Sequence, residues 1–161
     1  MEIKARHVYR APVDSVFKCF GSRGDIKAKH EALGARNIKI DRCDLTDTTL
    51  TLSLQRQVPA DAPAMLKKFL SEWNTINQTE NWSGQPGERY EGDFHVKIHG
   101  VPVTLDGKCV LTSEGDQAVN DVTVKVECNI PLVGKKLAAF IAENCAGTME
   151  QEYAFLKKLI E

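Results

Sequence analysis

A small group of polar residues occupies sequence positions where an alternating pattern otherwise places apolar side chains. The group consists of His7, Tyr9, Arg56, Gln78 and Glu80. Arg56, for example, continues the leucine alternation of residues 50–54, which has the two-residue period of a half-buried strand. Because a buried charge is costly unless it is paired, Arg56 and Glu80 need each other, a ligand or water.

Three interpretations of this group compete. In the first, Arg56 lies at the open end of its strand and reaches water, while Glu80 pairs with a local partner. In the second, the group fixes the polar end of a mostly apolar ligand, since such cavities need only a few placed polar groups. In the third, an enzyme uses His7 or Glu80 as general base, and Tyr9 or Arg56 stabilises an oxyanion. No nucleophile elbow, phosphate-binding glycine loop or HExxH motif defines a reaction.

The histidines at positions 95 and 99 resemble a metal-binding pair. Both fall on the polar side of the alternation over residues 89–99, together with Glu91, Asp93 and Lys97. Four residues along a strand span roughly 13 Å, so the two rings cannot bind one ion without a bend. No clustered His, Cys or Asp supplies the further ligands that zinc needs. We therefore expect a solvated face, no metal ion and no cofactor.

The elements that must position the polar group follow from the same periodicities. Residues 2–10 alternate as a strand; helical spacing follows from Pro12 to Phe20 and over about residues 24–32. Further strands are expected at 38–40, 49–55, 73–83, 89–99, 102–114 and 117–130. From about Leu132 apolar residues recur every three or four positions, which predicts a helix of about 28 residues and roughly 40 Å.

This order predicts one α+β domain over residues 1–161. Strands joined by short turns give an antiparallel sheet of about seven strands, which we expect to be curved. The terminal helix is the only element large enough to cover one face of that sheet. Its side chains, Met149 and Tyr153 among them, should form one wall of any cavity between helix and sheet.

Residues 58–72 interrupt the strand pattern. Pro59, Asp61 and Pro63 introduce a predicted short helix over Ala62–Ser71. Its apolar residues, expected to pack against something apolar, are Met65, Leu66, Phe69 and Leu70. The segment could be a satellite of the core, a lid over the cavity mouth that faces residues 131–140, or a site of transient contact with an anionic membrane.

Composition narrows the classes of function. Lys and Arg total 21 against 22 Asp and Glu, with no basic stripe, so a nucleic-acid partner is not expected. Five cysteines without a CxxC motif are typical of reduced thiols, which favours a cytoplasmic protein. The N-terminal residues do not resemble a signal peptide, and no apolar stretch approaches a membrane span. The oligomeric state stays open.

The element order resembles that of the START-like, or Bet v 1-like, superfamily, the helix-grip group that includes polyketide cyclases and lipid-transfer domains. Several strings also look like a bacterial family of unknown function within it. They are LGARN at 33–37, VPADAPAMLKKFLSEW at 58–73, GVPVTLDG at 100–107 and IPLVGKKLAAF at 130–140. The resemblance covers essentially the whole chain and implies a cavity between sheet and helix, although a fold does not define a function.

Together these observations predict a carrier or sensor of a hydrophobic small molecule or lipid. The residues expected to bind the ligand are His7, Tyr9, Arg56, Gln78, Glu80, Trp82, Tyr90, Phe94, Met149 and Tyr153. A cyclase-like or hydratase-like enzyme that uses His7, Arg56 and Glu80 is the first alternative. The second is a protein-interaction module that binds through a sheet edge or through residues 58–72.

Overall fold

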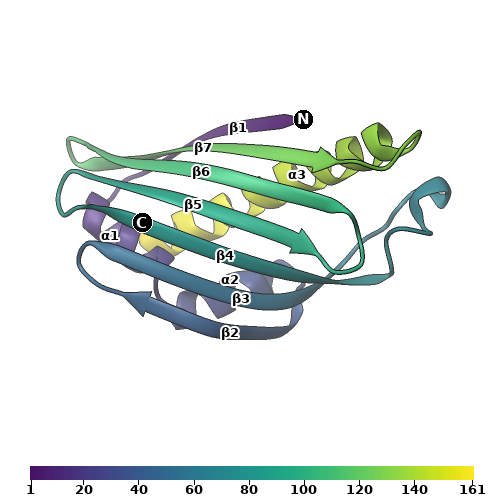
Figure 1. Cartoon of the computed structure of the whole chain (residues 1–161). Coiled ribbons are helices and arrows are strands. Elements are labelled where there is room, and N and C mark those ends of the chain that lie inside the picture. Colours follow the sequence, from purple (N-terminus) through teal and green to yellow (C-terminus); the bar gives the residue numbers. More distant parts are fainter.

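A computed structural model describes residues 1–161 as a curved antiparallel sheet of seven strands with helices on its concave side (Figure 1). The strand order is β1-β7-β6-β5-β4-β3-β2, so β1 and β2 form the two edges. The strands are β1 (Glu2–Tyr9), β2 (Arg36–Leu45), β3 (Thr49–Pro59), β4 (Trp73–Gln85), β5 (Arg89–Ile98), β6 (Val103–Glu114) and β7 (Gln117–Cys128). The helices are α1 (Val13–Phe20), α2 (Arg23–Ala32), the single 3-10 turn η1 (Ala64–Leu66) and α3 (Gly134–Ile160). The predicted helix-grip fold is confirmed.

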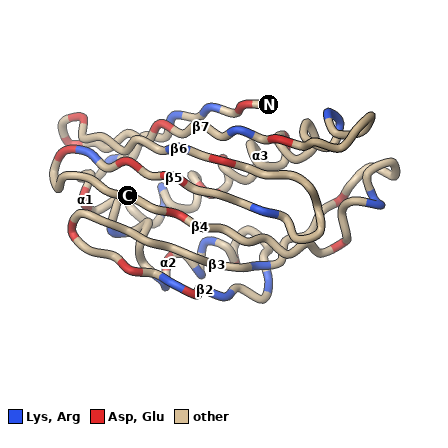
Figure 2. The backbone as a smooth tube through the Cα atoms, viewed as in Figure 1, with Lys and Arg blue, Asp and Glu red and all other residues tan.

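The alternation in the sequence determines which face of the sheet is buried. Leu50, Leu52 and Leu54 of β3 are 1–3% exposed and belong to the core, while the residues between them are half-buried. The predicted outward face of β5 is confirmed, because His95 lies in solvent and contacts Asp106 of β6. Figure 2 shows residues of both charge signs interspersed along the strands, with neither sign gathered in one region.

Helix α3 crosses the concave side behind the sheet (Figure 1). Leu137, Ile141 and Leu156 are buried, and the intervening apolar residues of the helix pack partly buried against the core. Near its C-terminal end, the Tyr153 hydroxyl donates to the backbone carbonyl of Val8 at 2.7 Å and accepts from the Val8 amide at 3.2 Å. One side chain therefore attaches the helix to the edge strand β1.

The shorter helices begin and end where the sequence indicates. Pro12 precedes α1 and Gly21 follows it. Ser22 caps α2, because its hydroxyl accepts from the Asp25 amide at 3.4 Å. Strand β2 is less regular than predicted: its pairing with β3 shifts register twice, and Asn37 adopts a positive φ of 52°.

Two aromatic rings lie over glycines of the neighbouring strand. Trp82 pairs in register with Gly92, and Phe94 pairs with Gly107. A Cβ atom built on Gly92 would lie 2.3 Å from the Trp82 ring, and one built on Gly107 would lie 2.0 Å from Phe94. Side chains on a sheet usually stand away from it. Here the missing glycine side chains let both rings lie down, which leaves space between the sheet and α3.

The predicted helix over Ala62–Ser71 is wrong. Only Ala64–Leu66 form a 3-10 turn, and Met65 is 50% exposed instead of packed. Two groups of contacts close the segment as a loop. The Asn74 side chain bonds the backbone of Ser71 in both directions, at 3.0 and 2.7 Å, and the amide of Ala60 donates to the carbonyl of Glu72. Because Ala60 and Glu72 are held side by side, a straight ten-residue helix, about 15 Å long, would not return the chain to β4.

Gly107→Ala should lower the free energy of unfolding by about 1–3 kcal/mol, because the new methyl group displaces the Phe94 ring. Gly147→Ala is the matched control: Gly147 lies in α3 with no atom within 4 Å of the added Cβ. That substitution should instead stabilise by about 0.5–1 kcal/mol through helix propensity. Urea unfolding of both variants measures the difference, and a neutral Gly107→Ala would contradict the proposed contact.

Candidate functional site

The space between the sheet and the helices is a cavity of about 460 Å³. That volume lies within the range of small-molecule sites. The cavity is lined by 39 residues, of which 24 are hydrophobic. Its walls come from the inward faces of the strands, from α2, from the inner side of α3 and from residues 58–61. Apolar residues therefore form the larger part of the wall, and the polar residues among them decide what the site can recognise.

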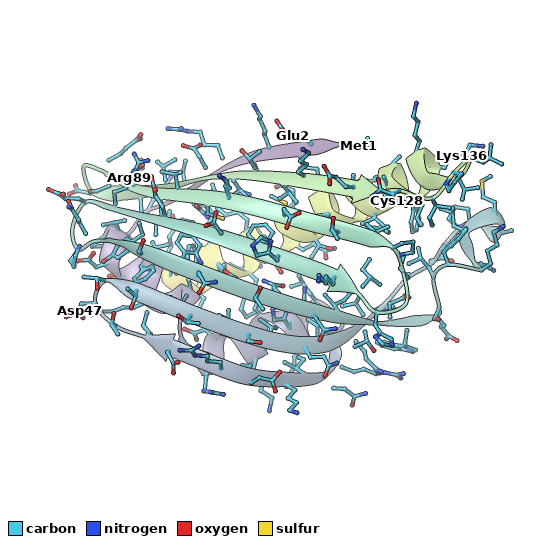
Figure 3. The ribbon with its side chains drawn as sticks, in the orientation of Figure 1. Met1, Glu2, Asp47, Arg89, Cys128 and Lys136 are labelled. Carbon is cyan, nitrogen blue, oxygen red and sulfur yellow. The ribbon has the colours of Figure 1, made fainter.

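Nine of the ten residues predicted to bind a ligand line this cavity. The exception is Tyr90, which is 1% exposed but packs elsewhere. Its ring stacks on Phe17 at 3.8 Å between centroids, and its hydroxyl donates to Asp14 at 2.8 Å. The same hydroxyl reaches the carbonyl of Asp47, and Figure 3 labels Asp47 with Arg89 at one end of the sheet. Alternation assigned Tyr90 to the correct face but could not show that α1 covers this end.

Four predicted residues form one hydrogen-bonded chain along β3 and β4. Arg56 Nη1 donates to Gln78 Oε1 at 2.9 Å, and Gln78 Nε2 donates to Glu80 Oε2 at 2.6 Å. Trp82 Nε1 donates to the other Glu80 oxygen at 3.0 Å. Gln78 thus lies between Arg56 and Glu80, which were expected to pair directly, and these two residues make no salt bridge.

Arg56 is the most deeply buried charge of the site. It is 8% exposed, so it does not reach water in the way the first interpretation of the sequence required. Burial lowers the pKa of Arg56, whereas the negative charges of Glu152 and Glu80 raise it. Neither acid forms a salt bridge with Arg56. Glu152 lies beside Lys29, and Glu80 accepts hydrogen bonds from Gln78 and Trp82.

The polar residues on the opposite wall are His7 and Asn120. They are register partners in β1 and β7, are 6% and 5% exposed, and line the cavity together. His7 stacks on Tyr153 at 4.3 Å between centroids, and burial lowers its pKa. His7 Nε2 and Asn120 Oδ1 have no hydrogen-bond partner. Three strands separate β1 from β4, and no hydrogen bond joins His7 to Glu80.

Helix α2 supplies site residues that sequence reasoning missed. Lys29 and His30 line the cavity, and Lys29 lies 4.0 Å from Glu152 of α3. Burial, with the positive charges of Lys29 and Arg56, lowers the pKa of His30 to about 2. The histidine is therefore neutral near pH 7. The only available signal was that His30 lies four residues after Ile26, on the same face of a short helix.

Three cysteines, Cys19, Cys109 and Cys145, also line the cavity. Burial raises the pKa of Cys19 to about 12 and that of Cys145 to about 11, and it raises the pKa of Cys109 as well. Because the thiolate is the nucleophilic form, these protonated thiols act as small apolar groups at neutral pH. The site thus presents hydrogen-bond donors and acceptors but no activated cysteine.

Nearly the whole chain matches one known family of proteins. A family model described as "Protein of unknown function (DUF2505)" matches residues 4–160. A comparison with curated protein sequences finds no match. No helix is both long and apolar enough to cross a membrane.

Several solved structures share the fold at low sequence identity. TTHA0849 from Thermus thermophilus is 14% identical with a TM-score of 0.65, and the match covers 99% of this chain and 97% of that protein. Ara h 8.0201 is 10% identical with a TM-score of 0.60 and the same two coverages. The ZhuI aromatase/cyclase from Streptomyces sp. R1128 is 11% identical with a TM-score of 0.56, and the coverages are 100% and 96%. These matches show that the chain shares its helix-grip fold with these proteins.

Stability should fall as the pH drops below about 6.5, partly because of His30. The folded protein keeps this ring neutral, whereas the unfolded chain protonates it near its ordinary pKa of 6.5. The unfolded state then binds more protons, so the contribution is present above 6.5 and decreases below it. Between pH 7.5 and 5.0, wild type should lose on the order of 1–2 kcal/mol more than His30→Gln in urea unfolding. Parallel losses in the two proteins would contradict this assignment.

Proposed function

The chain belongs to the DUF2505 family, and we propose that it binds a hydrophobic small molecule or lipid in the cavity, as a carrier or sensor. The observation that supports this most is the unfilled space of about 460 Å³, in whose wall 24 of the 39 residues are hydrophobic. Such a composition suits an apolar ligand whose orientation is fixed at a few points.

The contacts of the polar residues favour binding over catalysis. Both Glu80 oxygens accept hydrogen bonds from within the protein, and His7 stacks on Tyr153 while its Nε2 has no hydrogen-bond partner. A general base needs to reach the proton that it removes, and it is usually oriented by a second group. The cyclase-like alternative therefore lacks a paired base and orienting group, and the likeness to an aromatase/cyclase extends to the fold alone.

A cytoplasmic location is part of the proposal. All five cysteines are free, and three of them lie in the wall of the cavity. Disulfides are rare in reducing compartments, so a chain with several thiols and no bridge suits the cytoplasm.

Transient contact with an anionic membrane is a second part of the proposal. The loop that contains Met65 and the start of α3 lie at the same end of the sheet (Figure 1), where Figure 3 labels Lys136. Met65 is 50% exposed and Leu132 is 101% exposed. Leu132 also has a positive φ of 69°, a rare conformation for a bulky residue. Each apolar side chain lies near an exposed lysine pair, at 67–68 and 135–136, as in interfacial segments.

Ligand binding can be tested by native mass spectrometry of freshly purified protein and by displacement of a fluorescent fatty-acid probe. We expect a co-purified apolar ligand or saturable probe binding. Val96→Trp should fill the cavity and weaken probe binding at least about tenfold, or about 1.4 kcal/mol. Lys97→Trp places the same ring on the outer face and should leave binding unchanged. Apo protein that binds no probe, or equal effects of both variants, would refute the proposal.

Membrane contact can be tested by sedimentation with vesicles. Wild type should bind vesicles that contain phosphatidylserine more than neutral vesicles, and added salt should weaken that binding. The double variant Met65→Ser/Leu132→Ser should lose most of it. Leu159→Ser is the control, because Leu159 is also 47% exposed but lies at the other end of α3. Equal losses in both variants would contradict a specific docking end.

A further inference from the structure

Arg56 brings a positive charge into the cavity without a negative partner in contact. We infer that the ligand carries a carboxylate at its polar end and that Arg56 binds this group. The inference rests on the proposed function, since it specifies the ligand of the same cavity. Three features of the site support it: the free donors of Arg56, the prior engagement of the nearby acids, and the burial of the charge.

The first feature is the unused hydrogen-bonding capacity of Arg56. Nη1 donates to Gln78 at 2.9 Å, and no other hydrogen bond from the guanidinium group to the protein is present. An arginine side chain has five N–H donors in a planar fork. Because Arg56 lines the cavity, its remaining donors are available there. A carboxylate can accept two parallel hydrogen bonds from such a fork, which a hydroxyl group cannot.

The second feature is that each nearby acid already has another partner. Glu80 accepts from Gln78 and from Trp82, which fix both of its oxygens. Glu152 lies 4.0 Å from Lys29. Neither carboxylate comes within salt-bridge distance of Arg56, so the place beside the guanidinium group is left for a ligand.

The recognition must be local, because the cavity wall as a whole is not positive. Its ionisable residues include two bases, Lys29 and Arg56, against four acids, Asp25, Asp61, Glu80 and Glu152. His30 adds no charge near pH 7, since its pKa is lowered by burial. Glu80 should therefore oppose an anionic ligand, and Glu80→Gln, which keeps the shape of the side chain, should tighten carboxylate binding.

The third feature is the cost of burying Arg56. A buried charge without a partner destabilises a protein, and an anionic ligand in contact would offset that cost. Replacing Arg56 by Met should consequently weaken carboxylate binding without lowering the stability of the ligand-free protein to a similar degree. A residue that serves only to hold the fold would show the reverse, a loss of stability with little change in headgroup preference.

The test compares ligands of one chain length and different headgroups. Dodecanoate, dodecanol and methyl dodecanoate are titrated against wild type, Arg56→Met, Arg56→Lys and Glu80→Gln at pH 7.5 by probe displacement. We expect wild type to prefer dodecanoate at least tenfold, and Arg56→Met to abolish that preference while still binding the alcohol. Arg56→Lys should retain part of the preference, and Glu80→Gln should increase it.

Each outcome is decisive. Equal affinity of wild type for all three ligands would overturn the carboxylate inference and leave the proposed function intact. Absence of binding for all three would contradict both. If Arg56→Met does not fold, the headgroup preference of wild type and its change in Glu80→Gln decide the question. A uniform loss of affinity for all ligands in Arg56→Lys would show that Arg56 only supports the fold.

Discussion

The contact between Tyr153 and Val8 determines how the concave side of the sheet is closed. A sheet with one apolar face needs a cover, and α3 provides it only if both of its ends stay on the sheet. Near the C-terminal end, one hydroxyl bonds both backbone groups of the edge strand, at 2.7 and 3.2 Å. The same ring stacks on His7 and meets Tyr9 edge-on at 5.4 Å. The helix is therefore held by the strand that forms one wall of the cavity.

The cavity exists because the residues beneath the helix do not fill the space that the curvature creates. Trp82 and Phe94 would project into that space on an ordinary sheet, but glycines at positions 92 and 107 let their rings lie against the neighbouring strands. The polar chain from Arg56 to Trp82 runs along the same floor. Trp82 takes part in both features, because its ring lies over Gly92 and its indole nitrogen donates to Glu80.

Much of this arrangement could be predicted from the sequence, because period-two alternation is a local signal. It gave the correct face for Arg56, Gln78 and Glu80, and helical spacing gave the extent of α3 within a few residues. Contacts between distant elements left no such signal. The partner of Arg56 proved to be Gln78, and Lys29 came from a helix whose position beside the cavity depends on the whole fold. The loop at 58–72 kept helical spacing without forming a helix, because the Asn74 contacts with Ser71 fix a turn instead.

The irregular strand β2 has a further consequence for the behaviour of the molecule in a crowded solution. An open sheet ends in two rows of backbone groups that could pair with another chain and start edge-to-edge aggregation. At β1, Tyr153 occupies part of that row. At β2, two register shifts and the left-handed Asn37 distort it, and charged side chains such as Lys39 and Arg42 surround it. A protein that keeps a large apolar space inside can thus present edges on which a second copy cannot readily add a strand.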